Sequence, residues 1–248
     1  MHDETIVFEL ATHFLPKIAL RLECLYKTIH QSCEEVHPVI HHYALKSLIE
    51  LMGLVEKPEL KSRFLKELMR IEHALIKSNG KVSVELFSRL HLQIQTLTHV
   101  IGRFGENIHL NPFLQSIKQA QLTQIYDCEM HCPQLLLWLE STATLRQRDI
   151  AKWLLNLKAL QTTVSLYLAL LRDTAEFNRI EMLNGFYQRP LPPKTSCHLI
   201  LVRINKSFGI VPRMQLGHHG LSLRLCELAT MQDLHASAAS LELAICQL

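Results

Sequence analysis

The chain has 248 residues, of which 48% are hydrophobic and 20% are charged, and its formal net charge is +3. This composition excludes a disordered tail and predicts a folded chain with a packed core, in one large domain or two small ones. The basic residues alternate with acidic ones, which argues against a nucleic-acid partner but leaves room for a local basic patch that binds an acidic protein.

The sequence predicts a cytoplasmic protein. No apolar run approaches the ~20 residues that a membrane-spanning helix needs. The segment Met1–Leu10 starts with acidic residues and has no signal-peptide core or cleavage site. The odd, scattered set of cysteines is typical of reduced and mostly buried thiols. They are Cys24, Cys33, Cys128, Cys132, Cys197, Cys226 and Cys246.

The first predicted element is a strand at 6–10, where Ile6, Phe8 and Leu10 alternate with Val7 and Glu9. A strand of this length is not stable alone. We therefore expect it to join a sheet formed by strands near the C-terminus.

From about 16 to 174 the chain is predicted to be helical, because apolar residues recur every three or four positions. Prolines, glycines and polar clusters divide this region into roughly seven helices, and short connections favour an antiparallel bundle. The boundaries fall at Pro38, 56–58, 78–81, 102–107 and 127–133. The segment 145–171 is predicted to be the longest single helix.

After Phe177 the hydrophobic period changes to two, which predicts strands at 221–225 and 241–245, and 197–204 is apolar enough for a central strand. The proline-rich segment 190–193 is predicted to be a surface loop. The fold class is therefore α+β. We expect a helical bundle domain over 12–180 and a smaller antiparallel β domain, in which the N-terminal strand (1–11) joins the C-terminal strands (181–248).

Two groups of side chains raise the alternative of a metal-binding enzyme or sensor. His37 and His41 are four residues apart, but no glutamate base stands between them. The turn Cys128–Cys132, with His131, lacks the second pair of ligands that a structural zinc site needs. No metal site, catalytic residue or cofactor is therefore predicted.

Basic residues inside patterned segments form a third group. Each alone is typical of a solvated face, whereas a cluster of them would bind carboxylates and attract an acidic partner. They are Lys17, Arg21, Lys61, Arg63, Lys118, Arg203 and Arg224.

The segment LLRDTAEFNRIEMLNGFYQ (170–188) resembles the most recognisable part of the ZapD family of bacterial cell-division proteins. In it, Asn184-Gly185 is predicted to turn the chain into the sheet, with Phe186 and Tyr187 as anchors. Weaker similarities follow in the same order along the chain. They are IVFEL (6–10), LRLECL (20–25), LKELMR (65–70), CPQLLLWLE (132–140) and LELAIC (241–246).

The resemblance implies a non-enzymatic, cytoplasmic homodimer that dimerises through its helical domain. It implies binding of the C-terminal tail of FtsZ in a positively charged groove between the domains, and cross-linking of FtsZ filaments at the midcell division septum. The matching basic residues are Lys17, Arg21, Lys61, Lys118 and Arg224.

The chain departs from the family pattern at two positions. Where relatives carry further basic residues, this sequence has Gly220, preceded by His218 and His219, and Ala238. These departures imply a less positive groove, and the histidines imply that tail binding depends on pH.

Overall fold

We describe a computed structural model that covers residues 4–77, 83–122, 132–191, 197–218, 220–234 and 241–248. It divides into two compact units. One, the β unit, combines Met1–Lys17 with Leu168–Leu248; the other, the helical unit, is Ile18–Tyr167. Helices dominate one unit and antiparallel strands the other, so the α+β prediction is confirmed.

Eight α-helices lie in the described part of the chain, and several begin where the sequence predicts. Pro38 stands in the first turn of its helix, where its missing N–H costs nothing. The α-helices are α1 (Phe14–Cys33), α2 (Pro38–Leu54), α3 (Glu59–Lys77), α4 (Val84–His99), α5 (Pro112–Leu122), α7 (Pro133–Leu139), α8 (Ala143–Leu155) and α9 (Lys158–Asp173), and a short 3-10 helix, η1 (Glu106–Leu110), precedes α5.

The prediction of one long helix over 145–171 was wrong. Helix α8 ends at Leu155, α9 begins at Lys158, and the two helices differ in direction by 69°. Asn156 closes α8, since its side chain donates to the carbonyl of Lys152 at 3.0 Å. Leu157 is fully buried at the bend. The apolar period continues through the break because both helices bury apolar residues, so periodicity alone did not reveal it.

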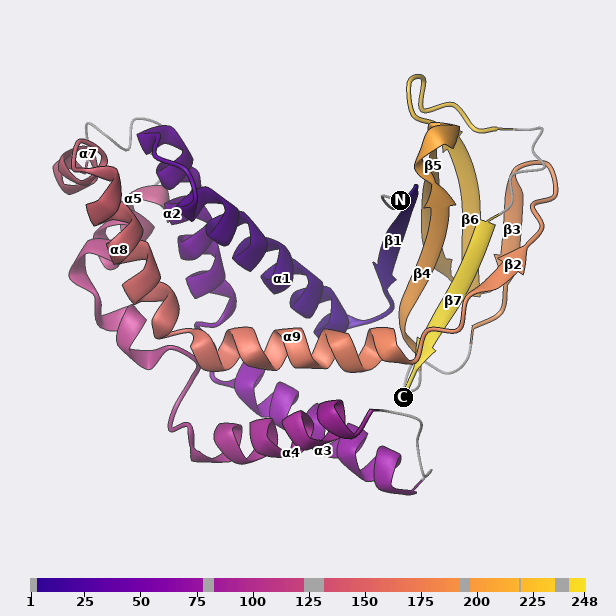
Figure 1. Cartoon of the computed structure of the whole chain (residues 1–248), viewed down its shortest axis with the longest axis horizontal. Coiled ribbons are helices and arrows are strands. Elements are labelled where there is room, and N and C mark those ends of the chain that lie inside the picture. The colour runs from indigo at the N-terminus through magenta and orange to yellow at the C-terminus, as the bar shows by residue number, and fades with distance from the viewer. Residues whose placement is uncertain (1–3, 78–82, 123–131, 192–196, 219, 235–240) are drawn as a thin grey trace. The chain divides into compact units, whose positions relative to one another are not determined.

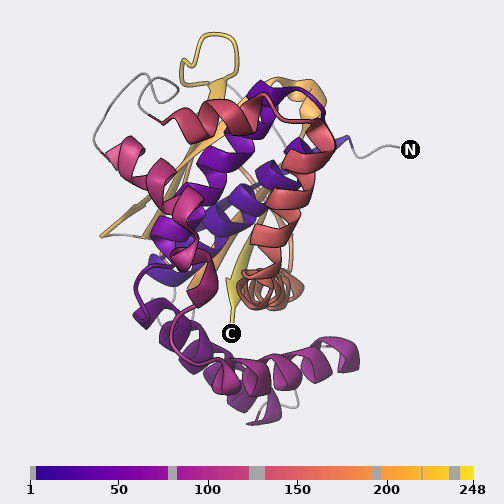
Figure 2. The same cartoon turned by 90° about the vertical axis from the view of Figure 1, so that its left-hand side faces the viewer.

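An aromatic cluster lies at the centre of the helical unit. Phe64 of α3 is fully buried and contacts Tyr167 and Phe104 edge to face, with ring centroids 5.7 and 6.4 Å apart. Figure 2 shows α3 and α4 side by side. The apolar stripe of α3 is buried and consists of Leu60, Phe64, Leu68, Ile71 and Leu75. The heptad-like spacing of that stripe therefore fixes which face of α3 is buried.

The β unit contains two antiparallel sheets (Figure 1). The four-stranded sheet has the order β1-β4-β7-β2, and the three-stranded sheet has the order β3-β6-β5. The N-terminal strand joins the C-terminal strands, as predicted, and β4 is central, also as predicted. The strands are β1 (Thr5–Ala11), β2 (Asn178–Ile180), β3 (Phe186–Arg189), β4 (Cys197–Asn205), β5 (Ile210–Gly217), β6 (Gly220–Glu227) and β7 (Leu241–Gln247), and a 3-10 turn, η2 (Lys206–Phe208), separates β4 from β5.

The two sheets share one hydrophobic core. Alternate residues of β4 and β6, such as Val202 and Leu223, are fully buried and belong to the same cluster. The predicted turn at Asn184-Gly185 is confirmed, because both residues have positive φ (51° and 69°), as a type I′ turn requires. This turn places Phe186 at the start of β3, opposite Arg224 of β6.

Candidate functional site

The five predicted partner-binding residues divide between the two units. Lys17 and Arg21 both lie on α1, four residues apart, so they share one face of that helix. Both are exposed. Arg21 forms a two-pronged ion pair with Glu50 of α2, with N–O distances of 2.7 and 2.6 Å. The guanidinium of Arg21 therefore already binds a carboxylate of the same chain, that of Glu50.

Lys61 and Lys118 each bind a residue in a connection between helices of the helical unit. The ammonium group of Lys61 donates to the carbonyl of Val100, directly after α4. Lys118 forms a 2.9 Å ion pair with Glu56, and its side chain is only 14% exposed. The hydrogen bond from Lys118 lowers the pKa of the Glu56 carboxyl. Both lysines thus fix the connections around α3.

Arg224 points outward from the strand predicted at 221–225, which is β6, since its neighbours Leu223 and Leu225 are fully buried. Its side chain is 52% exposed. The guanidinium lies over the ring of Phe186, 5.1 Å from the centroid, and also forms a 3.1 Å ion pair with Asp233.

Arg213 joins this site, although the sequence analysis did not single it out. It is the register partner of Arg224 in the β5–β6 hairpin, and it forms a 3.3 Å ion pair with the same Asp233. Pro212 obscured the strand pattern of β5. A signal was nevertheless present, because residues equidistant from the Gly217–Gly220 connection pair with each other in a hairpin.

Gly220, one of the two departures from the expected basic positions, has no room for a side chain. Its φ is +106°, and a Cβ atom there would collide with the backbone carbonyl of Arg189. The chain therefore needs glycine where β6 begins close to the end of β3. The other departure, Ala238, lies outside the described residues.

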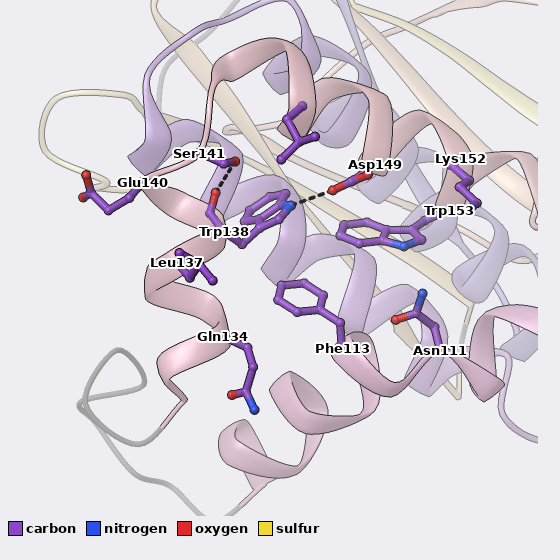
Figure 3. Close-up of a pocket in the computed structure, with 11 residues that line it drawn as sticks. Asn111, Phe113, Gln134, Leu137, Trp138, Glu140, Ser141, Asp149, Lys152 and Trp153 are labelled. Carbon is purple, nitrogen blue, oxygen red and sulfur yellow. Dashed lines mark hydrogen bonds between the residues drawn. The ribbon is translucent and has the colours of Figure 1, made fainter.

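A pocket of about 680 Å³ in the helical unit has an aromatic wall (Figure 3). Phe113 of α5 stacks on Trp153 of α8 with ring centroids 5.6 Å apart, and Trp138 of α7 lies 5.8 Å from Trp153. The indole N–H of Trp138 donates to Asp149 at 3.2 Å, and Figure 3 shows Lys152 on the same side of the pocket. The lining suits an apolar group with a polar edge.

The two histidines considered as metal ligands have other partners. His37 caps α2, with its Nδ1 accepting the N–H of Val39 at 3.3 Å. His41 is fully buried, and its Nδ1 accepts a 2.8 Å hydrogen bond from Nε of Arg146. Burial, followed by the charge of Arg146, lowers the pKa of His41.

The turn 128–132, the second group in the metal-binding alternative, lies mostly outside the described residues, which resume at Cys132. Within the described ranges, no group of three or more His, Cys, Asp or Glu side chains is arranged to hold a metal ion.

Comparison with known proteins decides which family this arrangement belongs to. A family model described as "ZapD: Cell division protein" matches residues 20–224. The chain belongs to the ZapD family. The resemblance inferred from the 170–188 segment is thereby confirmed, and the match includes Arg21, Lys61, Lys118 and Arg224 but not Lys17.

Curated relatives named cell division protein ZapD cover most of the chain. The protein of Coxiella burnetii is 25% identical over 230 residues, which is 90% of this chain and 89% of the relative. Those of Janthinobacterium sp. (strain Marseille) and Chromobacterium violaceum are both 28% identical, over 92% and 91% of this chain and 91% of each relative. The chain is therefore similar to ZapD proteins along nearly its full length, and a role in cell division follows from the family.

Taken singly, none of the helices in the described ranges is both long and apolar enough to cross a bilayer. The bent pair α8 and α9 is long and apolar enough only when its two helices are counted together.

Proposed function

We propose that this ZapD-family chain is a non-enzymatic division factor that binds the C-terminal tail of FtsZ. In this proposal it acts as a homodimer in the cytoplasm, at the midcell septum, and joins FtsZ filaments into bundles. The observation that carries the proposal is the ZapD family match over residues 20–224. The exposed arginines of α1 and β6 support it, since they suit an acidic peptide.

The proposed tail-binding residues are Lys17, Arg21, Lys61, Lys118 and Arg224. Arg21 and Arg224 are the strongest candidates, because their guanidinium groups are about half exposed and can bind a carboxylate through two N–H groups. Lys61 and Lys118 are more enclosed by their partners. We assign them mainly a contribution to the local positive potential.

To bind the tail, Arg21 and Arg224 must exchange the carboxylate that each contacts in the free chain for a carboxylate of the tail. The pair between Arg21 and Glu50 and the pair between Arg224 and Asp233 both lie at the surface. Exposed pairs of this kind stabilise a protein by only ~0–1 kcal/mol. An incoming tail carboxylate can therefore replace Glu50 or Asp233 at little energetic cost.

Cross-linking requires two tail sites in one particle. We propose that the helical domain forms the dimer, which would supply one site per protomer. Two filaments would then be joined through the high effective concentration of the second tail once the first is bound, so that modest single-site affinity suffices.

The experiment is a titration of this protein with a fluorescently labelled FtsZ tail peptide, followed by anisotropy. The proposal predicts saturable binding that weakens as salt is added, because the contacts are between exposed charges. The control is the same peptide with its acidic residues replaced by amides, which should bind more weakly. Equal binding of the two peptides would contradict recognition through carboxylates.

A further inference from the structure

The carboxylate of Asp233 has three partners on the outer face of the β3-β6-β5 sheet. Its Oδ1 lies 3.3 Å from Nη1 of Arg213 and accepts a 3.3 Å hydrogen bond from the thiol of Cys226. Its Oδ2 lies 3.1 Å from Nη1 of Arg224. These groups form a carboxylate-binding notch, which we define as Arg213, Arg224 and Cys226.

The notch favours a carboxylate for an electrostatic reason. Arg213 and Arg224 are directly opposite each other in an antiparallel pair, where like charges repel. A carboxylate between them removes this repulsion. The hydrogen bond from Cys226, together with the two arginines, holds the pKa of Asp233 below its usual range, so the occupant of the notch is an anion at neutral pH.

The backbone around Asp233 is bound in the manner of an extended peptide. The N–H of Glu227 donates to the carbonyl of Gln232 at 3.0 Å, and the N–H of Leu234 donates to the carbonyl of Leu225 at 2.8 Å. Asp233 and Cys226 form an antiparallel bridge. The side chain of Leu234 packs against the core of the β unit.

The segment Gln232–Leu234 thus lies beside β6 and presents an acidic residue followed by an apolar one. Main-chain hydrogen bonds to a strand, with side chains in adjacent sites, are one of the general ways in which proteins bind short peptides. The segment has the chemistry expected of a short acidic and apolar ligand.

We propose that Gln232–Leu234 is a built-in occupant of the notch, which an acidic partner peptide must displace. This inference rests on the proposed function, because the partner is the acidic tail proposed above to reach Arg224. The ion pairs are exposed and exchange readily. Since Asp233 is tethered beside the notch, it competes with a free peptide. The apparent affinity for the peptide is then the intrinsic affinity multiplied by the fraction of time that the notch is empty.

The test compares two single substitutions that change the net charge equally. Asp233→Asn removes the charge from the notch and keeps the shape of the side chain. Glu227→Gln removes one charge a short distance away, where the carboxylate of Glu227 accepts a hydrogen bond from Thr230 at 2.7 Å. The labelled tail peptide is titrated into the parent chain and both variants, and thermal melting verifies that each is folded.

The inference predicts that Asp233→Asn binds the peptide about threefold to tenfold more tightly than the parent, as expected when the competing carboxylate is removed. Glu227→Gln should bind within about twofold of the parent, because its carboxylate contacts Thr230 and neither arginine of the notch, and an exposed charge outside the notch is screened by salt. Tighter binding by Asp233→Asn alone supports the built-in occupant.

Two results overturn the inference, and they are distinguishable. If the parent binds the peptide and Asp233→Asn binds no more tightly than Glu227→Gln, the built-in occupant is wrong while the proposed function stands. If neither the parent nor Asp233→Asn binds the peptide, the proposed function fails and the inference fails with it.

Discussion

Nε of Arg146 donates a 2.8 Å hydrogen bond to Nδ1 of His41, and both side chains are buried in the helical unit. The other guanidinium nitrogens of Arg146 donate to backbone carbonyls, including those of Val36 and Leu139. Because Nδ1 of His41 accepts a hydrogen bond from a cation, the imidazole is held in its neutral form. Protonation of His41 would place two positive charges together in the core.

This contact predicts that the helical unit loses stability in mild acid. The pKa of His41 is lower in the folded chain than in the unfolded one, so the unfolded chain binds more protons at pH values just below its own histidine pKa. The stabilisation is therefore complete above about pH 6.5 and is lost as the pH falls towards the folded pKa. Thermal melting between about pH 7.5 and 5 measures this slope.

Substitution His41→Gln separates this histidine from the others. The Gln amide oxygen can still accept from Arg146, but it does not titrate. The variant should show a shallower fall of melting temperature with pH than the parent. His37→Gln is the control, because His37 caps α2 at the surface. An unchanged slope in His41→Gln would show that other groups, such as His109, whose pKa burial also lowers, cause the acid sensitivity.

Removal of the Phe64 ring should strongly destabilise the helical unit. Phe64 is fully buried between Phe104 and Tyr167, and Phe→Ala changes at such sites cost about 3–5 kcal/mol through lost burial and a residual cavity. Phe208→Ala, at a ring that is 49% exposed, should cost less than about 1 kcal/mol. Urea denaturation compares the two variants with the parent, and equal effects would contradict the central position of Phe64.

Two similar Arg–Glu pairs should differ in their contribution to stability. Arg172 and Glu9 form a two-pronged pair at 2.8 and 2.7 Å that ties α9 to β1, and their side chains are 34% and 20% exposed. The pair between Arg21 and Glu50 has the same form but is 51% and 43% exposed. Glu9→Gln should therefore lower the free energy of unfolding by about 1 kcal/mol, and Glu50→Gln should lower it by clearly less. The reverse order would refute this assignment.

Arg224→Glu should weaken binding of the FtsZ tail peptide by about 2 kcal/mol or more, because attraction to a carboxylate becomes repulsion. The fold should survive, since the side chain is 52% exposed. Arg189→Glu is a matched control, as Arg189 is an exposed arginine on the neighbouring strand β3. If the two variants lose the same affinity, Arg224 acts only through the general charge of the surface.

Much of the fold could be predicted from local patterns. Alternation located β1, β6 and β7, and it placed Arg224 on the outer face, because a strand with one buried face must alternate. Helical periodicity identified the buried stripe of α3. The break between α8 and α9 at Leu157 could not be predicted in the same way. The apolar pattern continues from one helix to the other, although the two helices point in different directions.

The partners of the site residues were not predictable from the sequence alone. Nothing local to Lys61 indicates that it donates to Val100, and nothing local to Asp233 indicates that it lies between Arg213 and Arg224. These contacts join positions brought together by helix packing or by the register of β5 and β6. The sequence could identify a basic residue type, whereas the structure was needed to show which carboxylate or carbonyl it meets.

The most direct test of the account is light scattering of FtsZ polymers mixed with this protein, supported by electron microscopy of the same samples. The account predicts that scattering rises and bundles appear with full-length FtsZ, and that both are absent with FtsZ that lacks its C-terminal tail. Equal bundling of the tail-less FtsZ would contradict the claim that this chain cross-links filaments through their tails.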